Sequence, residues 1–378
     1  MNRLRTAYQR ARPWIAVFDW PLAITLALIA GLSVITMYSA AHDFPGRIEA
    51  HLRNLALAVL ATWVAALVPR AWLMRLAVPL FIGGVVLLIA VALFGDIAKG
   101  ARRWLNLGFI RIQPSEVLKI AAPLMLAWYF QQREGATRWF DFAITAALLM
   151  APVWLIARQP DLGTALLVLA SGGFVIFLAG LSWKLMTSLA IGLAACAPLL
   201  WAAMHDYQRQ RVFTLLDPAS DPLGRGFHII QSTIAIGSGG VWGKGWMEGT
   251  QTRLEFVPER TTDFILAVFS EEFGLVGNGV LIALYLAVVL RALAIASSGL
   301  TLFDRLLAGA LALVFFVYAF VNMGMVSGVL PVVGVPLPFM SYGGTAMVTL
   351  GLGLGLVMGV ARARSRPESA AQRMNRFT

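Results

Sequence analysis

The sequence contains little charge, little lysine and almost no cysteine. Charged residues make up 13% of its 378 positions, whereas soluble globular proteins carry about 25%, which excludes an ordinary soluble domain. The single cysteine, Cys196, lies in an apolar run, which excludes an intrachain disulfide and a cysteine metal cluster. The histidines are scattered along the chain and suggest no Ser-His-Asp or metal-ligand cluster: His42, His51, His205 and His228.

Long hydrophobic runs dominate what is present. Apolar residues make up 59% of the chain and the mean hydropathy is +0.76, which is typical of a polytopic membrane protein. Taking about 20 apolar residues per crossing, we predict an all-α bundle of ten transmembrane helices in a single integral membrane domain, residues 1–378. The predicted spans lie near 20–41, 52–69, 74–95, 114–131, 141–158, 162–180, 184–204, 264–295, 304–328 and 340–362.

Arginine sets the predicted orientation. Arginines crowd the two tails, 1–19 and 363–378, so both tails are predicted to be cytoplasmic. No short cleavable hydrophobic segment precedes Trp20–Ala40, which we expect to remain as the first span. Loop 96–113 and the large loop 205–262, between the seventh and eighth helices, then lie outside. The basic residues occupy short loops and form no contiguous stripe, so nucleic acid is not an expected partner.

The outer loop 96–113 is basic, against the usual charge bias of outer loops. Its cations are Lys99, Arg102, Arg103 and Arg111, and Trp104 lies beside them. One interpretation is that the number of spans is wrong. The other is that these side chains form an anion site suited to a pyrophosphate or a lipid headgroup.

Two predicted spans begin with proline followed by an acidic residue. Pro114 precedes Glu116, and Pro160 precedes Asp161; both patterns are ordinary helix starts, and capping alone is one explanation of Asp161. Lys119 lies one turn into its span and is spaced to pair with Glu116 on one helix face. That pair is either a structural ion pair or part of a polar cavity, since an intramembrane pair should not face lipid.

Three acidic residues at the eighth span are the least expected feature of the chain. Asp263 lies at the mouth of the span, and Glu271 and Glu272 lie inside it, where an unpaired charge costs about 2.5–3.5 kcal/mol. We interpret Asp263 as the reactive carboxylate, and leave Glu271 and Glu272 open between a buried network and catalysis. From Asp263 to Arg291 a helix would cover roughly 42 Å against a hydrocarbon core of about 30 Å. The span therefore projects above the membrane or breaks near its glycines, Gly274, Gly277 and Gly279.

The outer loops contribute three further candidates. Lys244 follows Gly243, but the next residue is glycine, so the phosphate-loop nucleotide motif is absent and Lys244 is retained only as an added phosphate contact. Ser341 ends a proline-rich segment that re-enters the last span, where irregular backbone must lie against protein or a cavity. The role of Arg211 in the large loop is left open. The glycines at Gly351, Gly355 and Gly359 predict close helix packing.

Several motifs in the same order resemble the SEDS family of bacterial envelope proteins, and most closely its cell-elongation branch. The resemblance covers nearly the whole chain. The motifs are Lys99-Gly-Ala-Arg-Arg-Trp-Leu, Gln113-Pro-Ser-Glu-Val-Leu-Lys119, Gln159-Pro-Asp-Leu-Gly-Thr, His205-Asp-Tyr-Gln-Arg-Gln-Arg211, Leu216-Asp-Pro, Asp221-Pro-Leu-Gly, Gly243-Lys-Gly, Phe256-Val-Pro-Glu-Arg-Thr-Thr-Asp-Phe-Ile, Glu271-Glu-Phe-Gly and Pro336-Leu-Pro-Phe-Met-Ser-Tyr-Gly-Gly.

The resemblance implies a ten-span fold in the bacterial inner membrane and a peptidoglycan glycosyltransferase that polymerises lipid II during cell elongation, with its active site facing the periplasm. It implies a class B penicillin-binding protein transpeptidase as partner, together with other membrane proteins of the elongation complex. Asp263 matches the family's essential aspartate. Glu116 and Lys119 match its paired residues in the fourth span.

The chemistry of sugar transfer from a lipid pyrophosphate suits these residues. A carboxylate such as Asp263 can act as general base on an attacking sugar hydroxyl. Arg102, Arg103 and Lys119 can stabilise the leaving pyrophosphate, and a divalent cation such as Mg²⁺ or Mn²⁺, with Asp263 as its candidate ligand, can assist. No organic cofactor is expected. Because lipid II is α-linked and the polymer β-linked, one displacement with inversion is predicted.

Two other classes of function compete with this one. A lipid flippase would also combine ten spans, membrane-embedded acids and a basic outer cluster, but transporters often carry an internal repeat, and none is visible here. A scaffold that only recruits an enzyme would not need an acid at Asp263.

Overall fold

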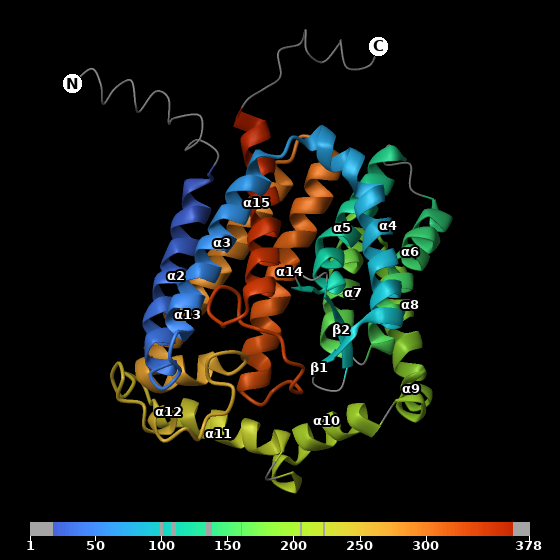
Figure 1. Cartoon of the computed structure of the whole chain (residues 1–378). Coiled ribbons are helices and arrows are strands. Elements are labelled where there is room, and N and C mark those ends of the chain that lie inside the picture. The colour runs from blue at the N-terminus through green and yellow to red at the C-terminus, as the bar shows by residue number, and fades with distance from the viewer. Residues whose placement is uncertain are drawn as a thin grey trace, which may run out of the picture.

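The computed structural model describes residues 18–98, 101–106, 111–133, 138–159, 161–204, 206–221 and 224–365. Within these ranges a helix, or a pair of helices, occupies each of the predicted spans (Figure 1). The helices are α2 (Trp20–Ala40), α3 (Arg47–Leu67), α4 (Arg70–Phe94), α5 (Pro114–Gln132), α6 (Trp139–Arg158), α7 (Leu162–Leu178), α8 (Trp183–Ala195), α9 (Ala197–Ala203), α13 (Ile265–Ser297), α14 (Leu302–Val326) and α15 (Gly344–Ser365).

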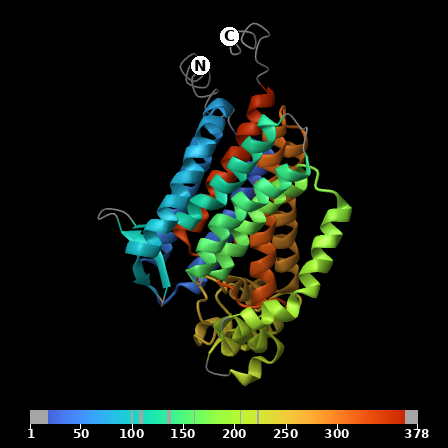
Figure 2. The ribbon, with the colours of Figure 1, turned by 90° about the vertical axis from the view of Figure 1, so that its right-hand side faces the viewer.

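Among the described residues, seven helices are long and apolar enough to cross a membrane: α2, α3, α4, α6, α13, α14 and α15. Helix α7 is apolar but shorter, and the seventh predicted span is divided between α8 and α9 at Cys196. The multi-pass membrane character is therefore clear, and the count of ten crossings stays a prediction. Figure 2 shows α8 at the edge of the bundle.

The described chain enters and leaves the bundle at the same end. The start of α2 and the end of α15 lie together at the top of Figure 1, and helices α10 (Asp206–Leu216) and α11 (Arg225–Ser238) of the large loop lie across the opposite end. That arrangement agrees with an even number of crossings. The tails 1–17 and 366–378 lie outside the described residues.

Close packing of α15 on α3 depends on glycine. A Cβ added at Gly351 would lie 2.6 Å from the carbonyl oxygen of Ala58, and one at Gly355 would lie 2.3 Å from that of Thr62. Both distances are below any ordinary carbon contact, so only glycine allows the two helix backbones to approach this far. The predicted packing role is confirmed for Gly351 and Gly355, whereas a Cβ at Gly359 would lie 3.5 Å from the carbonyl oxygen of Ala66, an ordinary contact.

The expectation of an all-α chain is wrong at one place. Loop 96–113 contains three short antiparallel strands, β1 (Asp96–Ala98), β2 (Ala101–Asn106) and β3 (Arg111–Ile112), in the order β1-β2-β3. Ladder pairing satisfies backbone groups that an open loop would leave to water. Strands β1 and β3 have three and two residues, too few for the alternating pattern that marks a strand in a sequence, and the residues of β2, Ala-Arg-Arg-Trp-Leu-Asn, do not alternate.

The long eighth span breaks at Gly274. This glycine has φ 62° and ψ −161°, which only glycine adopts readily, inside the range of α13. The segment Gly240–Gly245 fills the break. The amides of Lys244 and Gly245 donate to the carbonyls of Glu271 and Glu272, at 3.0 and 3.1 Å. In return, the amides of Leu275 and Val276 donate to the carbonyls of Gly240 and Val241, at 2.9 and 3.1 Å, so the kink leaves these four helix groups paired.

The described part of the large loop is folded into short helices. It contains α10, the 3-10 turn η1 (Pro218–Ser220), α11 and α12 (Thr250–Arg253). Helix α11 packs against α13 and α14, and the hydroxyl of Ser232 donates to the carbonyl of Val326 at 2.8 Å. The loop is thereby fixed to the end of the bundle at which α13 begins.

Candidate active site

Asp263 lies in the turn just before α13 and faces a glycine of the re-entrant loop between α14 and α15. A Cβ added at Gly334 would lie 3.4 Å from Oδ2 of Asp263, and Gly334 has φ +75°. The backbone of Asp263 is fixed by Asn322 of α14, whose amide nitrogen donates to the Asp263 carbonyl at 2.9 Å and to the Val335 carbonyl at 2.7 Å. Asn322 is fully buried, and the sequence alone did not single it out.

The turn that carries Asp263 is also tied to α2 and to the last loop. The amide of Tyr342 donates to the carbonyl of Thr261 at 2.8 Å. Arg260 donates to the carbonyl of Ala40 at 2.9 Å and forms an ion pair with Asp43. Burial raises the pKa of Asp43, but the hydrogen bond from Arg260, hydrogen bonding with Glu255 and the backbone, and the charge of Arg260 together outweigh it and hold that pKa below its usual value. The position of Asp263 is therefore set from three directions.

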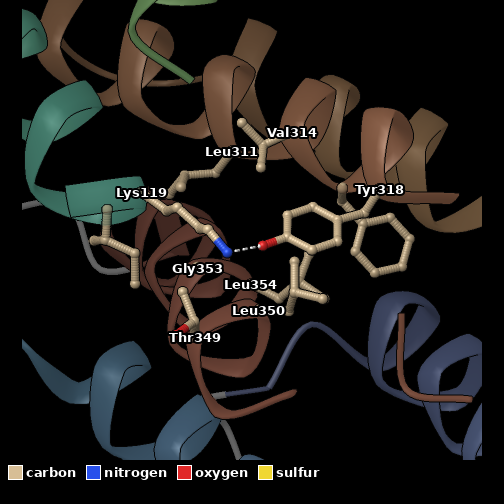
Figure 3. A pocket seen from close by; sticks show the side chains of 10 residues that line it. Lys119, Leu311, Val314, Tyr318, Thr349, Leu350, Gly353 and Leu354 are labelled. Carbon is tan, nitrogen blue, oxygen red and sulfur yellow. Dashed lines mark hydrogen bonds between the residues drawn. The ribbon is translucent and has the colours of Figure 1, made fainter. Parts of the chain in front are cut away.

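The predicted Glu116–Lys119 pair is present and is buried in the bundle. Nζ of Lys119 lies 2.6 Å from Oε1 of Glu116 and 2.6 Å from the hydroxyl oxygen of Tyr318 on α14 (Figure 3). Lys119 is 4% exposed and Tyr318 is fully buried, so this cation is held by a carboxylate and a phenol away from lipid. Oε2 of Glu116 is buried without a hydrogen-bond partner. Tyr318 was not predicted, because aromatic residues are common in apolar helices.

Asp161 caps α7, as one interpretation of the sequence has it, and also pairs with a cation that was not predicted as its partner, while a substrate contact by Asp161 stays a prediction. Its Oδ1 accepts from the amide of Thr164 at 3.2 Å and caps α7, and its Oδ2 lies 3.6 Å from Nε of Arg103 on β2. The start of α7 also touches the re-entrant loop, because a Cβ at Gly163 would lie 2.8 Å from the carbonyl oxygen of Val333. Val333 precedes Gly334, so Asp263 and the start of α7, where Asp161 pairs with Arg103, border the same short piece of loop.

Arg102 and Arg111 of the basic cluster lie on the same small sheet, on β2 and β3. Arg102 is exposed on β2, and the half-buried Trp104 is paired in register with Asp96 of β1. Lys99 falls outside the described residues. The sheet therefore presents Arg102 to the surroundings and directs Arg103 to Asp161.

Lys244 and Glu271 form a separate cluster. Nζ of Lys244 lies 2.8 Å from Oε1 of Glu271, which also accepts from the amide of Gln251 at 2.8 Å. The other oxygen of Glu271 accepts from the amide and hydroxyl of Thr252, at 3.1 and 2.9 Å. Glu271 is fully buried, so this network fixes the glycine-rich segment beside the kink. The structure thus supports the network interpretation of Glu271.

Glu272, Ser341 and Arg211 also lie in ordered surroundings. Glu272 is buried and accepts from the hydroxyl of Ser39 and from the amide of Met247. The hydroxyl of Ser341 accepts from the amide of Leu337 at 2.8 Å, which shapes the re-entrant loop. Arg211 is half-buried on α10. A substrate contact by Lys244 or Ser341 stays a prediction.

The fit of a divalent cation depends on the carboxylates of the site. Within the ranges that the structure describes, no group of three or more His, Cys, Asp or Glu side chains could hold a metal ion. Mg²⁺ commonly binds through one or two carboxylates together with substrate phosphates. Asp263, together with the phosphates of a pyrophosphate substrate, fits that mode of binding.

A model of the family described as FtsW, RodA and SpoVE cell cycle proteins matches residues 13–366. The chain belongs to this family. Among the FtsW/RodA/SpoVE proteins, the peptidoglycan glycosyltransferase MrdB of Escherichia coli (strain K12) is 52% identical over 330 residues, covering 87% of this chain and 89% of that protein. MrdB of Helicobacter pylori (strain J99) is 37% identical over 300 residues, covering 78% and 77%.

Solved structures give the same result. A peptidoglycan synthase complex, described as showing structural coordination of polymerization and crosslinking, contains a chain that matches with a TM-score of 0.80 and 36% identity, over 92% of this chain and 99% of that one. RodA of Thermus thermophilus, a rod shape determining protein, matches with a TM-score of 0.70 and 32% identity, over 92% and 98%. The resemblance to the SEDS family and its elongation branch is confirmed.

Proposed function

We propose that this chain is a peptidoglycan glycosyltransferase that polymerises lipid II, with Asp263 as general base. The observation that carries the assignment is the position of Asp263 against Gly334, on the loop that also borders the Arg103–Asp161 pair. A carboxylate and a cation then flank one irregular segment of backbone. Irregular backbone at membrane depth is expected where it lines a cavity.

The reaction is one displacement at the anomeric carbon of the donor sugar. A hydroxyl of the acceptor sugar attacks this carbon, its proton passes to the Asp263 carboxylate, and the bond from the carbon to the pyrophosphate oxygen breaks with inversion. The electron pair of that bond leaves on the lipid pyrophosphate. General base catalysis of this kind contributes about 10²–10⁴-fold to a rate.

The cations serve the departing pyrophosphate. Arg103 is held by Asp161, and Arg102 lies exposed next to it on β2. Successive strand residues point to opposite faces of a sheet, so the two guanidinium groups would reach phosphate oxygens from different directions. Lys119 adds positive charge from within the bundle. A divalent cation held by Asp263 and the substrate phosphates would supply further charge neutralisation. Trp104 offers an aromatic surface to the substrate next to these arginines.

The cellular setting follows from the family and from the charge pattern. We place the chain in the bacterial inner membrane, with ten crossings, both tails in the cytoplasm and Asp263 on the periplasmic side. The match to a peptidoglycan synthase complex supports a class B penicillin-binding protein transpeptidase as partner, within the cell-elongation machinery. Other membrane proteins of that machinery complete the proposed assembly.

Purified full-length protein with lipid II and its transpeptidase partner tests this function. Wild type should yield glycan chains on a gel. Asp263→Asn should yield none. Glu248→Gln is its matched control, because it removes an exposed carboxylate from the large loop that precedes Asp263. Absence of polymer from the wild-type complex, with lipid II crossing the bilayer of vesicles that contain the protein, would contradict the polymerase assignment and favour a flippase.

A further inference from the structure

A cavity lies at the opposite end of the bundle from Asp263. It has a volume of about 630 Å³ and is formed by the corner between α3 and α4, the loop between α13 and α14, the start of α14 and the end of α15. Asp263 is tied to Asn322 near the end of α14, whereas Asp304 at the start of α14 lines this cavity. These 18 positions along the helix correspond to about 27 Å, so the cavity is separate from the candidate active site.

The mouth of the cavity is positively charged. Arg70 and Arg362 line it, and Asp304 is its single acidic lining residue. A side-chain nitrogen of Arg362 donates to the carbonyl of Leu67 at 3.0 Å, three residues before Arg70, so both guanidinium groups lie at the α3–α4 corner. Two further arginines near the same helix ends, Arg75 and Arg305, are exposed.

Asp304 does not cancel this charge. It forms an ion pair with Arg70, with 3.1 Å between Nη1 and Oδ2, which uses one of the five N–H donors of that guanidinium. Arg362 adds a second positive charge. The first turns of α4 and α14 also lie here, and their amide groups favour an anion.

The walls behind this mouth are apolar. They come from four helices and include Ala65, Leu73, Met74, Leu307, Leu356 and Val360. The volume lies in the range of ligand pockets, about 300–1,000 Å³. A basic mouth above apolar walls at the end of membrane-spanning helices has the polarity of a lipid: an anionic head group and a hydrocarbon chain.

We propose that this cavity binds an anionic phospholipid, with its phosphate at Arg70 and Arg362 and an acyl chain against the apolar walls. The tail of the chain itself is a poor occupant, because residues 366–378 carry three arginines against one glutamate and would be repelled by the mouth. A soluble anion would leave the apolar walls without a partner.

Lipid titration of the full-length protein in detergent, followed by native mass spectrometry, tests the proposal. The probes are phosphatidylglycerol, zwitterionic phosphatidylcholine and inorganic pyrophosphate. Wild type should hold one phosphatidylglycerol in preference to phosphatidylcholine. Arg362→Gln should lower the affinity for phosphatidylglycerol by about fivefold, since one arginine contributes about 1 kcal/mol to anionic lipid binding.

Two further variants make the test specific. Arg364→Gln removes the same charge from an exposed position on the same helix and should leave the affinity unchanged. Ala71→Trp, on α4, fills the cavity without changing its charge and should lower the affinity for phosphatidylglycerol by more than about tenfold. Thermal unfolding without lipid checks that each variant is folded.

Three results would overturn the proposal. Equal losses in Arg362→Gln and Arg364→Gln would mean binding by general surface charge. Unchanged affinity in Ala71→Trp would place the lipid elsewhere. If pyrophosphate displaced phosphatidylglycerol and bound to wild type as tightly as the lipid does, the cavity would be assigned to a soluble anion.

Discussion

Tyr318 and Asn322 lie one turn apart on α14, and they hold the two parts of the candidate site. Tyr318 bonds Lys119, and Asn322 bonds the backbone of Asp263. Residues four apart share one helix face and are separated by about 6 Å along the axis. One rigid helix face therefore sets the spacing between the buried cation and the turn that carries Asp263.

Replacing Asn322 by leucine should lower polymerisation strongly. Leucine is close in size but cannot donate, so the buried carbonyls of Asp263 and Val335 lose their partner at a cost of about 1–3 kcal/mol. The polymerisation rate should fall with little change in lipid II affinity, because the base loses its position and the substrate contacts remain. A rate equal to wild type would show that this anchor is dispensable.

Tyr318→Phe should disturb Lys119 without changing the shape of the core. Of the two hydrogen-bond partners described for the buried Lys119 ammonium, Tyr318 and Glu116, the variant keeps only Glu116. We therefore expect the free energy of unfolding to fall by about 1–3 kcal/mol. The rate of polymerisation should fall as well. Tyr285→Phe is the matched control, because it removes another buried hydroxyl, which donates to the carbonyl of Pro338. Similar activity in both variants would argue against a specific role for the Tyr318–Lys119 bond.

Gly334→Ala should lower polymerisation activity by more than its loss of stability explains. The residue has φ +75°, where alanine costs roughly 1–2 kcal/mol, and its new methyl would touch the Asp263 carboxylate. Gly328→Ala is the control, since Gly328 has the same φ of +75° in the same loop but faces Ile229 and Thr233. Both variants should unfold at lower temperature, and only Gly334→Ala should lose polymerisation beyond that. Parallel losses in the two would remove the special position of Gly334.

Glu271→Gln should destabilise the large loop more than the bundle. The carboxylate accepts from Lys244, Gln251 and Thr252, and a neutral amide loses the ion pair and turns a donor toward existing donors. Proteolysis or hydrogen exchange should report faster opening of residues 239–254. Lys244→Met should give the same local effect if the pair acts as a unit. Protection equal to wild type in both variants would contradict the network.

The sequence predicted the parts of the fold that depend on long patterns. Hydropathy placed the apolar helices of the bundle, and the glycine repeat predicted close packing of α15, which the structure shows against α3. The excess length of the eighth span left a break near Gly274 as one of two alternatives, and the structure has that break. The small sheet was missed because β1 and β3 are too short to show alternation and the residues of β2 do not alternate. The fold class is therefore mainly helical, with this sheet as an addition.

The candidate site was predicted less completely. Glu116 and Lys119 were recognised because their spacing joins them on one helix. Arg103 and Asp161 were identified separately, and only the folded chain pairs them across 58 positions. Asn322 and Tyr318 act through contacts with distant segments, and a buried asparagine or tyrosine in an apolar helix has no local signature.

The most direct test is the single-turnover rate of Asp263→Asn in complex with the transpeptidase partner, measured beside its affinity for lipid II. Asparagine keeps the shape of the side chain and cannot accept the proton, so the rate should fall by about 10²–10⁴-fold while affinity stays near that of wild type. Glycan synthesis by Asp263→Asn at the wild-type rate would contradict the account.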